Sequence, residues 1–425
     1  MNNPGDTYDV LVIGGGPAGL AAALSAQQSG LRVAIVDDNP GLGGQIWRGD
    51  QHKPGTPEAA QWLRRVATAQ VKFISGAYVY EQPEPGLLLA ETFEGRRELG
   101  YQKLILATGA RERFLPFPGW TLPGVAGAGG LQALVKSGLP MAGKKIVVAG
   151  TGPLLLAVAA YLQKQSANVL LIAEQASQLL SFGLSLWRWP SKIFQAIQLK
   201  RELAGIRHLT NCWVESAHGD NRLQRITLRH GQKTWDVACD YLACGFHLVP
   251  NVEVAVFFGC ELQEGVVQVD ELQATTVPGI YCAGEATGIG GLELSLVEGQ
   301  IAGFAATNQV QQARALFAER DKLQQFANLL NRTFALRDEL KRLPQPDTIV
   351  CRCEDVSFAR AEKYPEWRAA KLHTRCGMGP CQGRICGPAL EFLLHWQPES
   401  VRPPVFPVKV GNLIRDAGSL IEQEQ

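Results

Sequence analysis

The sequence is poor in charge. Only 19% of its 425 residues are Asp, Glu, Lys or Arg, below the usual fraction of about 25%. The 41 basic and 40 acidic residues leave a net charge of +1, and no long run of lysine or arginine occurs. The electrostatic footprint of a nucleic-acid-binding protein is therefore missing. A low charged fraction instead favours extensive buried or subunit-facing surface.

Long hydrophobic runs are also missing. The longest apolar stretch, around residues 154–162, is shorter than the roughly 20 residues that span a bilayer. The opening residues, Met-Asn-Asn-Pro-Gly-Asp, do not have the basic and apolar regions of a secretory signal. We therefore expect a cytoplasmic protein without a membrane-spanning segment. The length suggests roughly two to four domains of about 100–200 residues each.

Cysteine pairs are scarce in the first 350 residues, where no Cys-x-x-Cys occurs. Half of the ten cysteines lie instead between Cys351 and Cys386. In a cytosolic chain, such clustering is typical of metal binding or redox chemistry rather than of a disulfide framework. Thiol exchange through a protein dithiol is not expected, and we interpret the single thiol of Cys282 as core packing.

A first dinucleotide-type unit lies over residues 8–37, where a strand, three glycines, a helix and a second strand follow one another. In the motif Gly14-x-Gly16-x-x-Gly19, the first glycine allows a tight turn and the second lets the backbone approach a pyrophosphate. The third permits close helix–strand packing. Asp37 ends the second strand, 23 residues after Gly14, where a carboxylate can hold ribose hydroxyls. The order of these features predicts dinucleotide binding.

A second unit begins near Lys145, with the degenerate motif Gly150-x-Gly152-x-x-Leu155. The third glycine is replaced by leucine, so helix–strand packing is looser than in the first unit. Glu174 at the end of the next strand favours NAD over NADP, and no arginine cluster follows that would hold a 2′-phosphate. A working NAD site and a structural relic or docking surface both remain open.

Further motifs appear in a recognisable order: Gly43-Gly44-Gln45, then Ala107-Thr108-Gly109, then Gly279 to Glu285. Over about residues 6–306 this order resembles the flavoprotein family with two dinucleotide domains, which includes glutathione and thioredoxin reductases. The resemblance implies FAD in the first unit and NAD(P)H in the inserted one. A late Gly-Asp pair of that family, here Gly284-Glu285, contacts the ribityl–phosphate part of FAD.

The motif and the resemblance together assign fourteen residues to the first dinucleotide: Gly14, Gly16, Pro17, Ala18, Gly19, Asp37, Asp38, Gly44, Gln45, Arg48, Thr108, Gly109, Gly284 and Glu285.

The strongest signal lies near the C-terminus, where Cys351-x-Cys353 is followed by Cys376-Gly-Met-Gly-Pro-Cys381-Gln-Gly-Arg-Ile-Cys386. Two close pairs on separated loops can clamp one compact metal centre, and four thiolates suit zinc or an iron–sulfur cluster. The pattern resembles the bacterioferritin-associated ferredoxin type of [2Fe–2S] domain. That resemblance implies Cys351, Cys353, Cys381 and Cys386 as ligands, with Cys376 as a fifth candidate. Zinc and metal-free thiols are the alternatives.

Candidates for acid–base catalysis are few, and no catalytic residue is assigned. The seven histidines, His52, His208, His218, His230, His247, His373 and His395, have no motif spacing with a nucleophile. His247 is either close to the flavin or structural. The apolar stretch 179–197, with Trp187 and Trp189, is either a partner-binding face or part of the core.

The expected fold is α/β, with two Rossmann-like domains of the FAD/NAD(P) disulfide-reductase-like type and a small C-terminal α-helical [2Fe–2S] domain. The predicted boundaries are 1–115 with 265–310 for the split FAD-type domain, 116–264 for the NAD-like domain, 311–347 for a helical connector, 348–390 for the iron–sulfur domain and 391–425 for an extended tail.

The whole chain is similar to the α-type component of heteromeric amine-oxidising dehydrogenases, such as octopine and nopaline oxidases, hydrogen cyanide synthase, and proline and hydroxyproline dehydrogenases. The similarity rests on the FAD-type fold, the degenerate second unit, the segment Gly44-Gln45-Ile46-Trp47-Arg48 and the C-terminal cysteine pattern. It implies a partner β subunit, an FAD protein resembling D-amino-acid oxidase, which oxidises the C–N bond. In some systems a small third subunit is present.

The same similarity implies that this chain moves electrons onward through flavin and a [2Fe–2S] cluster to a quinone or another acceptor. Some relatives hold an FMN at the subunit interface, and some carry a different nucleotide in the first site. Two other functions stay open on the sequence: a self-sufficient NAD(P)H-dependent oxidoreductase, and a non-catalytic scaffold that binds a nucleotide for structure.

Overall fold

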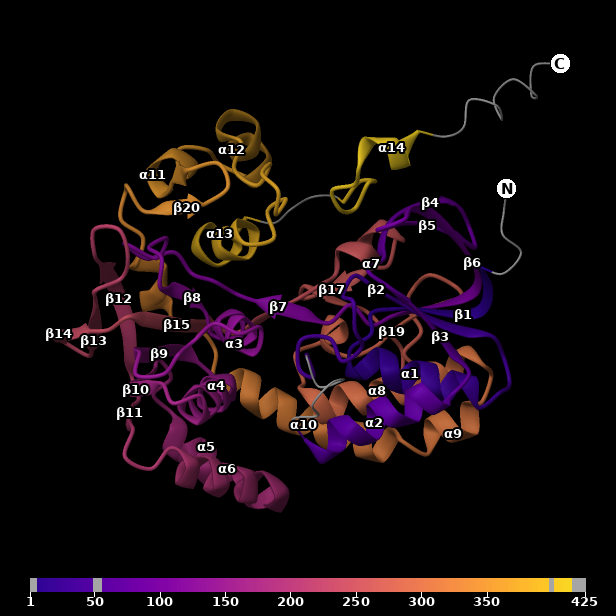
Figure 1. Cartoon of the computed structure of the whole chain (residues 1–425), viewed down its shortest axis with the longest axis horizontal. Coiled ribbons are helices and arrows are strands. Elements are labelled where there is room, and N and C mark those ends of the chain that lie inside the picture. Colours follow the sequence, from indigo (N-terminus) through magenta and orange to yellow (C-terminus); the bar gives the residue numbers. More distant parts are fainter. Residues whose placement is uncertain (1–5, 49–55, 397–400, 415–425) are drawn as a thin grey trace. The chain divides into compact units, whose positions relative to one another are not determined.

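The computed structural model describes residues 6–48, 56–396 and 401–414 (Figure 1). The chain divides into two compact units, described separately below. The first comprises residues 1–110, 250–327 and 400–425, and the second comprises 111–249 and 328–399. Each contains a β-sheet with a run of parallel strands, so the predicted α/β class with two Rossmann-like sheets is confirmed.

The first unit is built on a seven-stranded sheet made of β1 (Thr7–Ile13), β2 (Val33–Asp37), β3 (Val71–Ser75), β4 (Tyr78–Glu84), β5 (Leu87–Thr92), β6 (Gly95–Leu106) and β19 (Ile280–Cys282). Their order is β3-β2-β1-β6-β5-β4, and β19 pairs with β6. The first half of β6 pairs with the antiparallel β5, and its second half pairs with the parallel strands β1 and β19. The central strands are almost wholly buried, as expected where both sheet faces are covered.

The helices of the first unit are α1 (Pro17–Gln27), α2 (Pro57–Thr68), α7 (Glu253–Phe257), α8 (Leu292–Ala306), α9 (Val310–Arg314) and α14 (Val410–Leu413), together with the first part of α10 (Phe317–Thr333). Helix α1 begins directly after Gly16 with a proline in its first turn, a position where proline's fixed φ suits the helix. It lies against α8 in backbone contact, since a Cβ on Gly299 or Gly303 would meet the carbonyls of Ala18 or Ala22.

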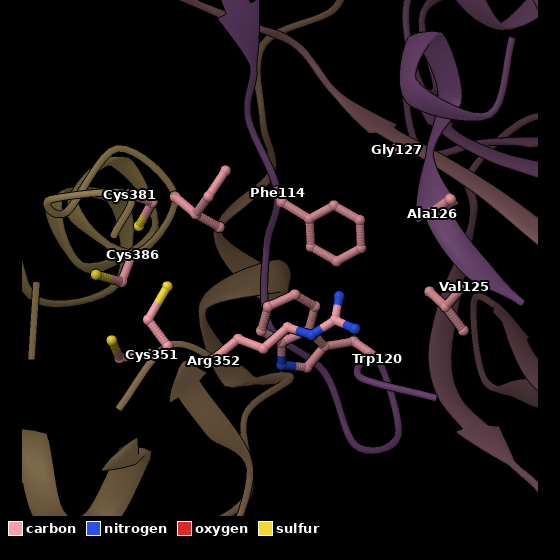
Figure 2. A pocket seen from close by; sticks show the side chains of 11 residues that line it. Phe114, Trp120, Val125, Ala126, Gly127, Cys351, Arg352, Cys381 and Cys386 are labelled. Atoms are coloured by element: carbon pink, nitrogen blue, oxygen red, sulfur yellow. The ribbon is translucent and has the colours of Figure 1, made fainter. Parts of the chain in front are cut away.

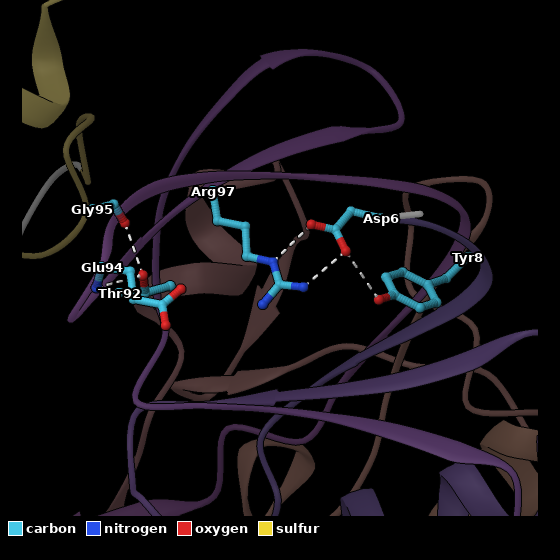
Figure 3. Close-up of polar contacts among 6 residues, drawn as sticks. All are labelled: Asp6, Tyr8, Thr92, Glu94, Gly95 and Arg97. Atoms are coloured by element: carbon cyan, nitrogen blue, oxygen red, sulfur yellow. Dashed lines mark hydrogen bonds and ion pairs between the residues drawn. The ribbon is translucent and has the colours of Figure 1, made fainter. Parts of the chain in front are cut away.

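An ion pair holds the start of β1 against β6 (Figure 3). Arg97 donates from Nε and Nη2 to the two carboxylate oxygens of Asp6, at 2.7 and 2.8 Å. This hydrogen bonding lowers the pKa of Asp6 below its usual value. Tyr8 also donates its hydroxyl to Asp6, at 3.5 Å. The contacts fix the pairing of the two strands that carry the first glycine loop and Thr108.

The segment 401–414 lies along β4 and β5 of the first unit. Val405 is buried, and its N–H donates to the carbonyl of Tyr80 at 3.0 Å. Tyr80 in turn donates its hydroxyl to the carbonyl of Asn412 at 2.8 Å. Of the tail predicted over 391–425, residues 397–400 and 415–425 lie outside the described ranges.

The second unit contains a five-stranded parallel sheet of β8 (Val125–Gly127), β9 (Lys145–Thr151), β10 (Asn168–Glu174), β11 (Arg207–Leu209) and β15 (Tyr241–Phe246). Their order is β11-β10-β9-β15-β8. Helices α3 (Ala128–Lys136) and α4 (Pro153–Lys164) share a core with one face of the sheet. The other face packs against an antiparallel sheet of β12 (Cys212–His218), β13 (Arg225–His230) and β14 (Lys233–Ala238). Helices α5 (Leu179–Ser185) and α6 (Pro190–Glu202) follow β10.

The cysteine-rich segment has a small core of its own within the second unit. Its elements are β20 (Ile349–Cys351), β21 (Val356–Ser357), α11 (Phe358–Ala361), α12 (Trp367–Thr374) and α13 (Cys386–Leu394). The remaining short strands are β7 (Ala110–Glu112), β16 (Leu248–Pro250), β17 (Leu262–Gln263) and β18 (Val266–Val267), and 3-10 helices cover Leu186–Arg188, Glu285–Thr287 and Asp338–Arg342. Within the described residues, every helix is too short or too polar to cross a bilayer.

Candidate functional site

The first glycine loop closes tightly on the backbone around it. Gly14 has a φ of 108°, and a Cβ there would meet the carbonyl oxygen of Ala107. A Cβ on Gly19 would likewise meet the carbonyl of Gly14. Only glycine fits these two close approaches. They bring the N-terminus of α1, with Pro17 and Ala18, directly to the end of β1, as a dinucleotide cradle requires.

The two acidic residues at the end of β2 have different environments. Asp37 is buried, and its carboxylate accepts from the N–H of Gly15 at 2.5 Å and of Asn39 at 2.7 Å. Asp38 is exposed, and partial desolvation together with the neighbouring Asp37 charge raises its pKa to about 6. Asp37 therefore braces the glycine loop, while Asp38 is exposed beside it and accepts a hydrogen bond from Nδ2 of Asn39 at 2.7 Å.

The loop with Gly44, Gln45 and Arg48 lies on the glycine loop. Gly43 donates its N–H to the carbonyl of Gly15 at 2.7 Å. A Cβ on Gly44 would lie 2.9 Å from the Cα of Gly16. Arg48 is anchored by a hydrogen bond from Nη2 to Oδ1 of Asn39 at 3.1 Å. At the end of β6, Thr108 donates its hydroxyl to the carbonyl of Asn251 at 2.6 Å, and Gly109 follows with a φ of 68°.

Gly284 and Glu285, from a later segment of the first unit, lie beside the start of α1. A Cβ on Gly284 would lie 2.7 Å from the Cβ of Ala18. Oε1 of Glu285 accepts from the N–H of Gly291 at 2.9 Å, whereas its buried Oε2 has no hydrogen-bond partner. Burial raises the pKa of Glu285 to about 7. An unpaired buried oxygen beside the cradle suits a hydrogen-bonding ligand, so these residues fit a bound dinucleotide.

Sequence reasoning missed Glu298, which lies on α8 behind this loop. Its Oε2 accepts from the N–H of Gly284 at 2.9 Å and from the hydroxyl of Thr287 at 3.0 Å. Burial also raises the pKa of Glu298 to about 7. No motif spacing marks this glutamate, because its role depends on α8 packing against the loop.

The C-terminal cysteines gather at one place. The sulfurs of Cys351, Cys376 and Cys386 lie within 4.8 Å of one another, and all three residues are buried. Cys353 and Cys381 are hydrogen-bonded to one another beside this group, and the thiols of Cys376 and Cys386 lower the pKa of Cys351 to about 2. Two of the four predicted ligands, Cys351 and Cys386, thus share the buried group with the fifth candidate, Cys376, whereas the predicted ligands Cys353 and Cys381 lie beside it and are less buried. Such a thiolate-rich donor set fits zinc or an iron–sulfur cluster.

Glycines and one tryptophan hold this cysteine group in place. A Cβ on Gly379 would meet the Cβ of Cys353. Gly377 and Gly383 both have a φ of 80°, and both lie against the ring of the buried Trp367 on α12. No sequence pattern marks Trp367, since it lies in the stretch between Cys353 and Cys376, away from both groups of cysteines.

A pocket of about 440 Å³ adjoins the cysteines. One wall is formed by Phe114, Trp120 and residues 125–127, and the other by Cys351, Cys353, Cys381, Cys386, Ile385 and Arg352. Figure 2 shows the Arg352 side chain extended from the cysteine side toward Trp120. An aromatic, mostly apolar pocket with one cation suits a planar group that carries negative charge.

The other candidate residues of the sequence that the structure describes are packed or hydrogen-bonded within the protein. His247, directly after β15, is half-buried and hydrogen-bonded to Asn331, and desolvation lowers its pKa. His52 lies outside the described residues. The buried Cys282 has a pKa raised well above its usual value. Cys239 and Cys244 have the Cys-x4-Cys spacing found in some redox pairs. Burial raises the pKa of both thiols and disfavours their thiolates.

The apolar stretch 179–197 is divided between core and surface. Leu186 and Trp189 are buried. Trp187 is 74% exposed and Phe194 is 69% exposed, so part of the stretch presents aromatic side chains to solvent.

Two dinucleotide-type sheets in one chain, one within a sequence insertion into the other, define an oxidoreductase of the two-domain flavoprotein class. The pyridine nucleotide-disulphide oxidoreductase family matches residues 8–315, and the chain belongs to this family. No redox dithiol of a disulfide reductase accompanies the first cradle among the described residues.

The curated relatives include components of multi-subunit enzymes. The HcnB subunit of hydrogen cyanide synthase from Pseudomonas protegens is 28% identical, over 88% of this chain and 89% of its own. The A-type subunit of opine oxidase from Agrobacterium tumefaciens is 29% identical, over 96% of this chain and 92% of its own. The crystal structure of L-proline dehydrogenase from P. horikoshii has the same fold, with a TM-score of 0.70, 21% identity, and coverage of 96% of this chain and 80% of that one.

Proposed function

We propose that this chain is the electron-transfer subunit of a heteromeric flavin-dependent dehydrogenase that oxidises a C–N bond of an amino-acid or opine-type substrate. A separate FAD-containing subunit resembling D-amino-acid oxidase, in some assemblies joined by a small third subunit, performs the oxidation. The proposal is supported by similarity over nearly the whole length to subunits of opine oxidase and hydrogen cyanide synthase.

The single observation that carries the proposal is the cysteine group beside the pocket. The buried sulfurs of Cys351, Cys376 and Cys386 gather there, Cys353 and Cys381 lie beside them, and an aromatic pocket adjoins the group. When bound, an FAD in the first cradle and a [2Fe–2S] cluster on Cys351, Cys353, Cys381 and Cys386 would take up an electron pair and release it one electron at a time.

The chain's own residues would hold and separate these groups. Gly14, Gly16 and Gly19 admit the pyrophosphate at the start of α1, and Asp38 lies open for a ribose hydroxyl. Residues Phe114 and Trp120 give the pocket an apolar wall, and Arg352 gives it positive charge. We assign this pocket to a planar redox group, either an FMN, which is an anion, or a quinone-type acceptor, whose head group is neutral.

The test is Cys381→Ser in the complex with the partner subunit, with Cys260→Ser as the control. Cys260 is a buried thiol of the first unit, outside the cysteine group. Under anaerobic conditions, substrate should still bleach the partner's flavin in both variants. Only Cys381→Ser should lose the iron–sulfur EPR signal and turnover with a quinone. If Cys381→Ser abolishes the first flavin reduction, the division of labour is wrong.

A further inference from the structure

The carboxyl ends of the second unit's parallel strands are covered by the chain itself. Ligands of open α/β sheets bind in the crevice beyond these ends. Here residues 331–337 occupy that place. Thr151, the last residue of β9, donates its hydroxyl to the carbonyl of Phe334 at 3.2 Å. Gln175, directly after β10, donates from Nε2 to the carbonyl of Ala335 at 3.0 Å.

The same segment reaches the neighbouring strands on both sides. Arg337 donates from Nη1 to Oδ1 of Asn211, which follows β11, at 2.5 Å. Asn331 is hydrogen-bonded to His247, which follows β15. The order β11-β10-β9-β15 makes these four adjacent strands. One stretch of chain therefore contacts the residues at the carboxyl ends of four of the five strands.

The contacts of Gln175 and Phe334 are buried. Gln175 is 1% exposed, and its Oε1 accepts from the N–H of Arg337 at 3.2 Å. The ring of Phe334 is buried and meets Phe182 edge to face, with centroids 5.5 Å apart. The segment makes three hydrogen bonds with the side chains of Thr151 and Gln175, and without it the bond between these two side chains, from Gln175 Nε2 to Oγ1 of Thr151 at 2.9 Å, would remain.

The second cradle lacks the second acidic residue that the first cradle has at its strand end. Asp37 and Glu174 play the same part, since Glu174 accepts from the N–H of Gly152 and of Ala176, both at 2.8 Å. The next residue differs. Asp38 is exposed and open to a ribose, whereas Gln175 is buried and hydrogen-bonded to the covering segment. The second site has no acidic side chain left for a ribose at this strand end.

We propose that residues 331–337 form an intrachain plug in the second dinucleotide groove, so that the groove anchors the segment leading to the cysteine group and admits neither NADH nor NADPH. The continuation of the segment supports the anchoring role. Leu340 and Leu343 are buried in the core of the second sheet, and Trp120 donates from Nε1 to the carbonyl of Ile349 at 2.6 Å. The proposal does not depend on the identity of the substrate or the acceptor.

The test combines nucleotide binding with hydrogen–deuterium exchange on the full chain. Wild-type protein should give no calorimetric binding signal with millimolar NADH or NADPH, and neither nucleotide should slow exchange over residues 150–155. In Gln175→Ala, exchange of residues 333–337 should rise by at least about tenfold, because the variant loses two hydrogen bonds to the segment and one lost buried hydrogen bond already corresponds to about tenfold. Gln198→Ala, an exposed glutamine on α6, is the matched control and should leave that exchange unchanged.

Two results would overturn the plug. One is submillimolar binding of NADH to the wild-type chain with protection of residues 150–155. The other is equal exchange of residues 333–337 in Gln175→Ala and in the control. If Gln175→Ala does not fold, Arg337→Ala removes the contact with Asn211 and gives the same readout.

Discussion

At the residue scale, the buried glutamates behind the first cradle predict a pH dependence. Burial holds the pKa of Glu298 at about 7 in the folded chain, whereas an unfolded glutamate titrates near ~4.3. The contribution of Glu298 to the free energy of unfolding is therefore fully present below the unfolded pKa and is lost as the pH rises through about 7. The shift corresponds to a few kcal/mol, on the order of 3.

Glu298→Gln, which stays neutral, should accordingly flatten the fall in unfolding free energy between acidic and slightly alkaline pH. Urea unfolding of the flavin-free chain across this range measures it. The exposed Glu319 on α10 offers the control, and Glu319→Gln should keep the wild-type pH profile. An unchanged slope in Glu298→Gln would show that this glutamate is already ionised in the folded chain.

At the scale of elements, the contact between α1 and α8 sets the position of the glycine loop. A Cβ on Gly303 would meet the carbonyl of Ala22 and lie 2.9 Å from the Cβ of Ser25. Gly303→Ala should therefore push α1 away, at a cost of about 1–3 kcal/mol, and reduce the flavin retained per chain. Thermal unfolding and the flavin absorbance of purified protein measure both effects.

Gly411→Ala, on α14, is the matched control because nothing lies within 4 Å of a Cβ there. It should keep full flavin content and wild-type thermal stability or better, since alanine favours helix over glycine. Equal flavin content in Gly303→Ala and wild type would mean that α8 does not position the loop.

At the scale of the whole molecule, the chain should be inactive toward substrate by itself. The described residues offer cofactor cradles and thiols, whereas His247, the one histidine proposed near a flavin, is hydrogen-bonded to Asn331. We expect the purified chain to give no dye reduction with amino acids or opines, and activity to appear only when the partner subunit is added. Substrate-dependent dye reduction by the chain alone would contradict this assignment of roles.

Motifs with local causes could be predicted from the sequence. The close approach of Gly19 to the carbonyl of Gly14 lies within one strand–turn–helix segment, so the spacing predicts it, whereas the contact of Gly14 with Ala107 depends on the pairing of β1 with β6. The converging cysteines could be expected as well, although the place of Cys376 among the buried sulfurs depends on how its loop folds over Trp367. Glu298 could not be found, since nothing near it in sequence reveals that α8 turns it toward Gly284.

The class of the protein, with two dinucleotide-type units and a C-terminal cysteine group, follows from the amino-acid order alone, because glycines, strand ends and cysteine spacings are local features. Only the tertiary structure decides whether the dinucleotide groove of the second unit is open or filled. Its motif, Gly150-x-Gly152 followed by Glu174, is compatible with a nucleotide site. The groove is filled by residues that lie 160 positions after Gln175 and 183 positions after Thr151. Burial of Thr151 and Gln175 against that segment depends on long-range packing that no local pattern encodes.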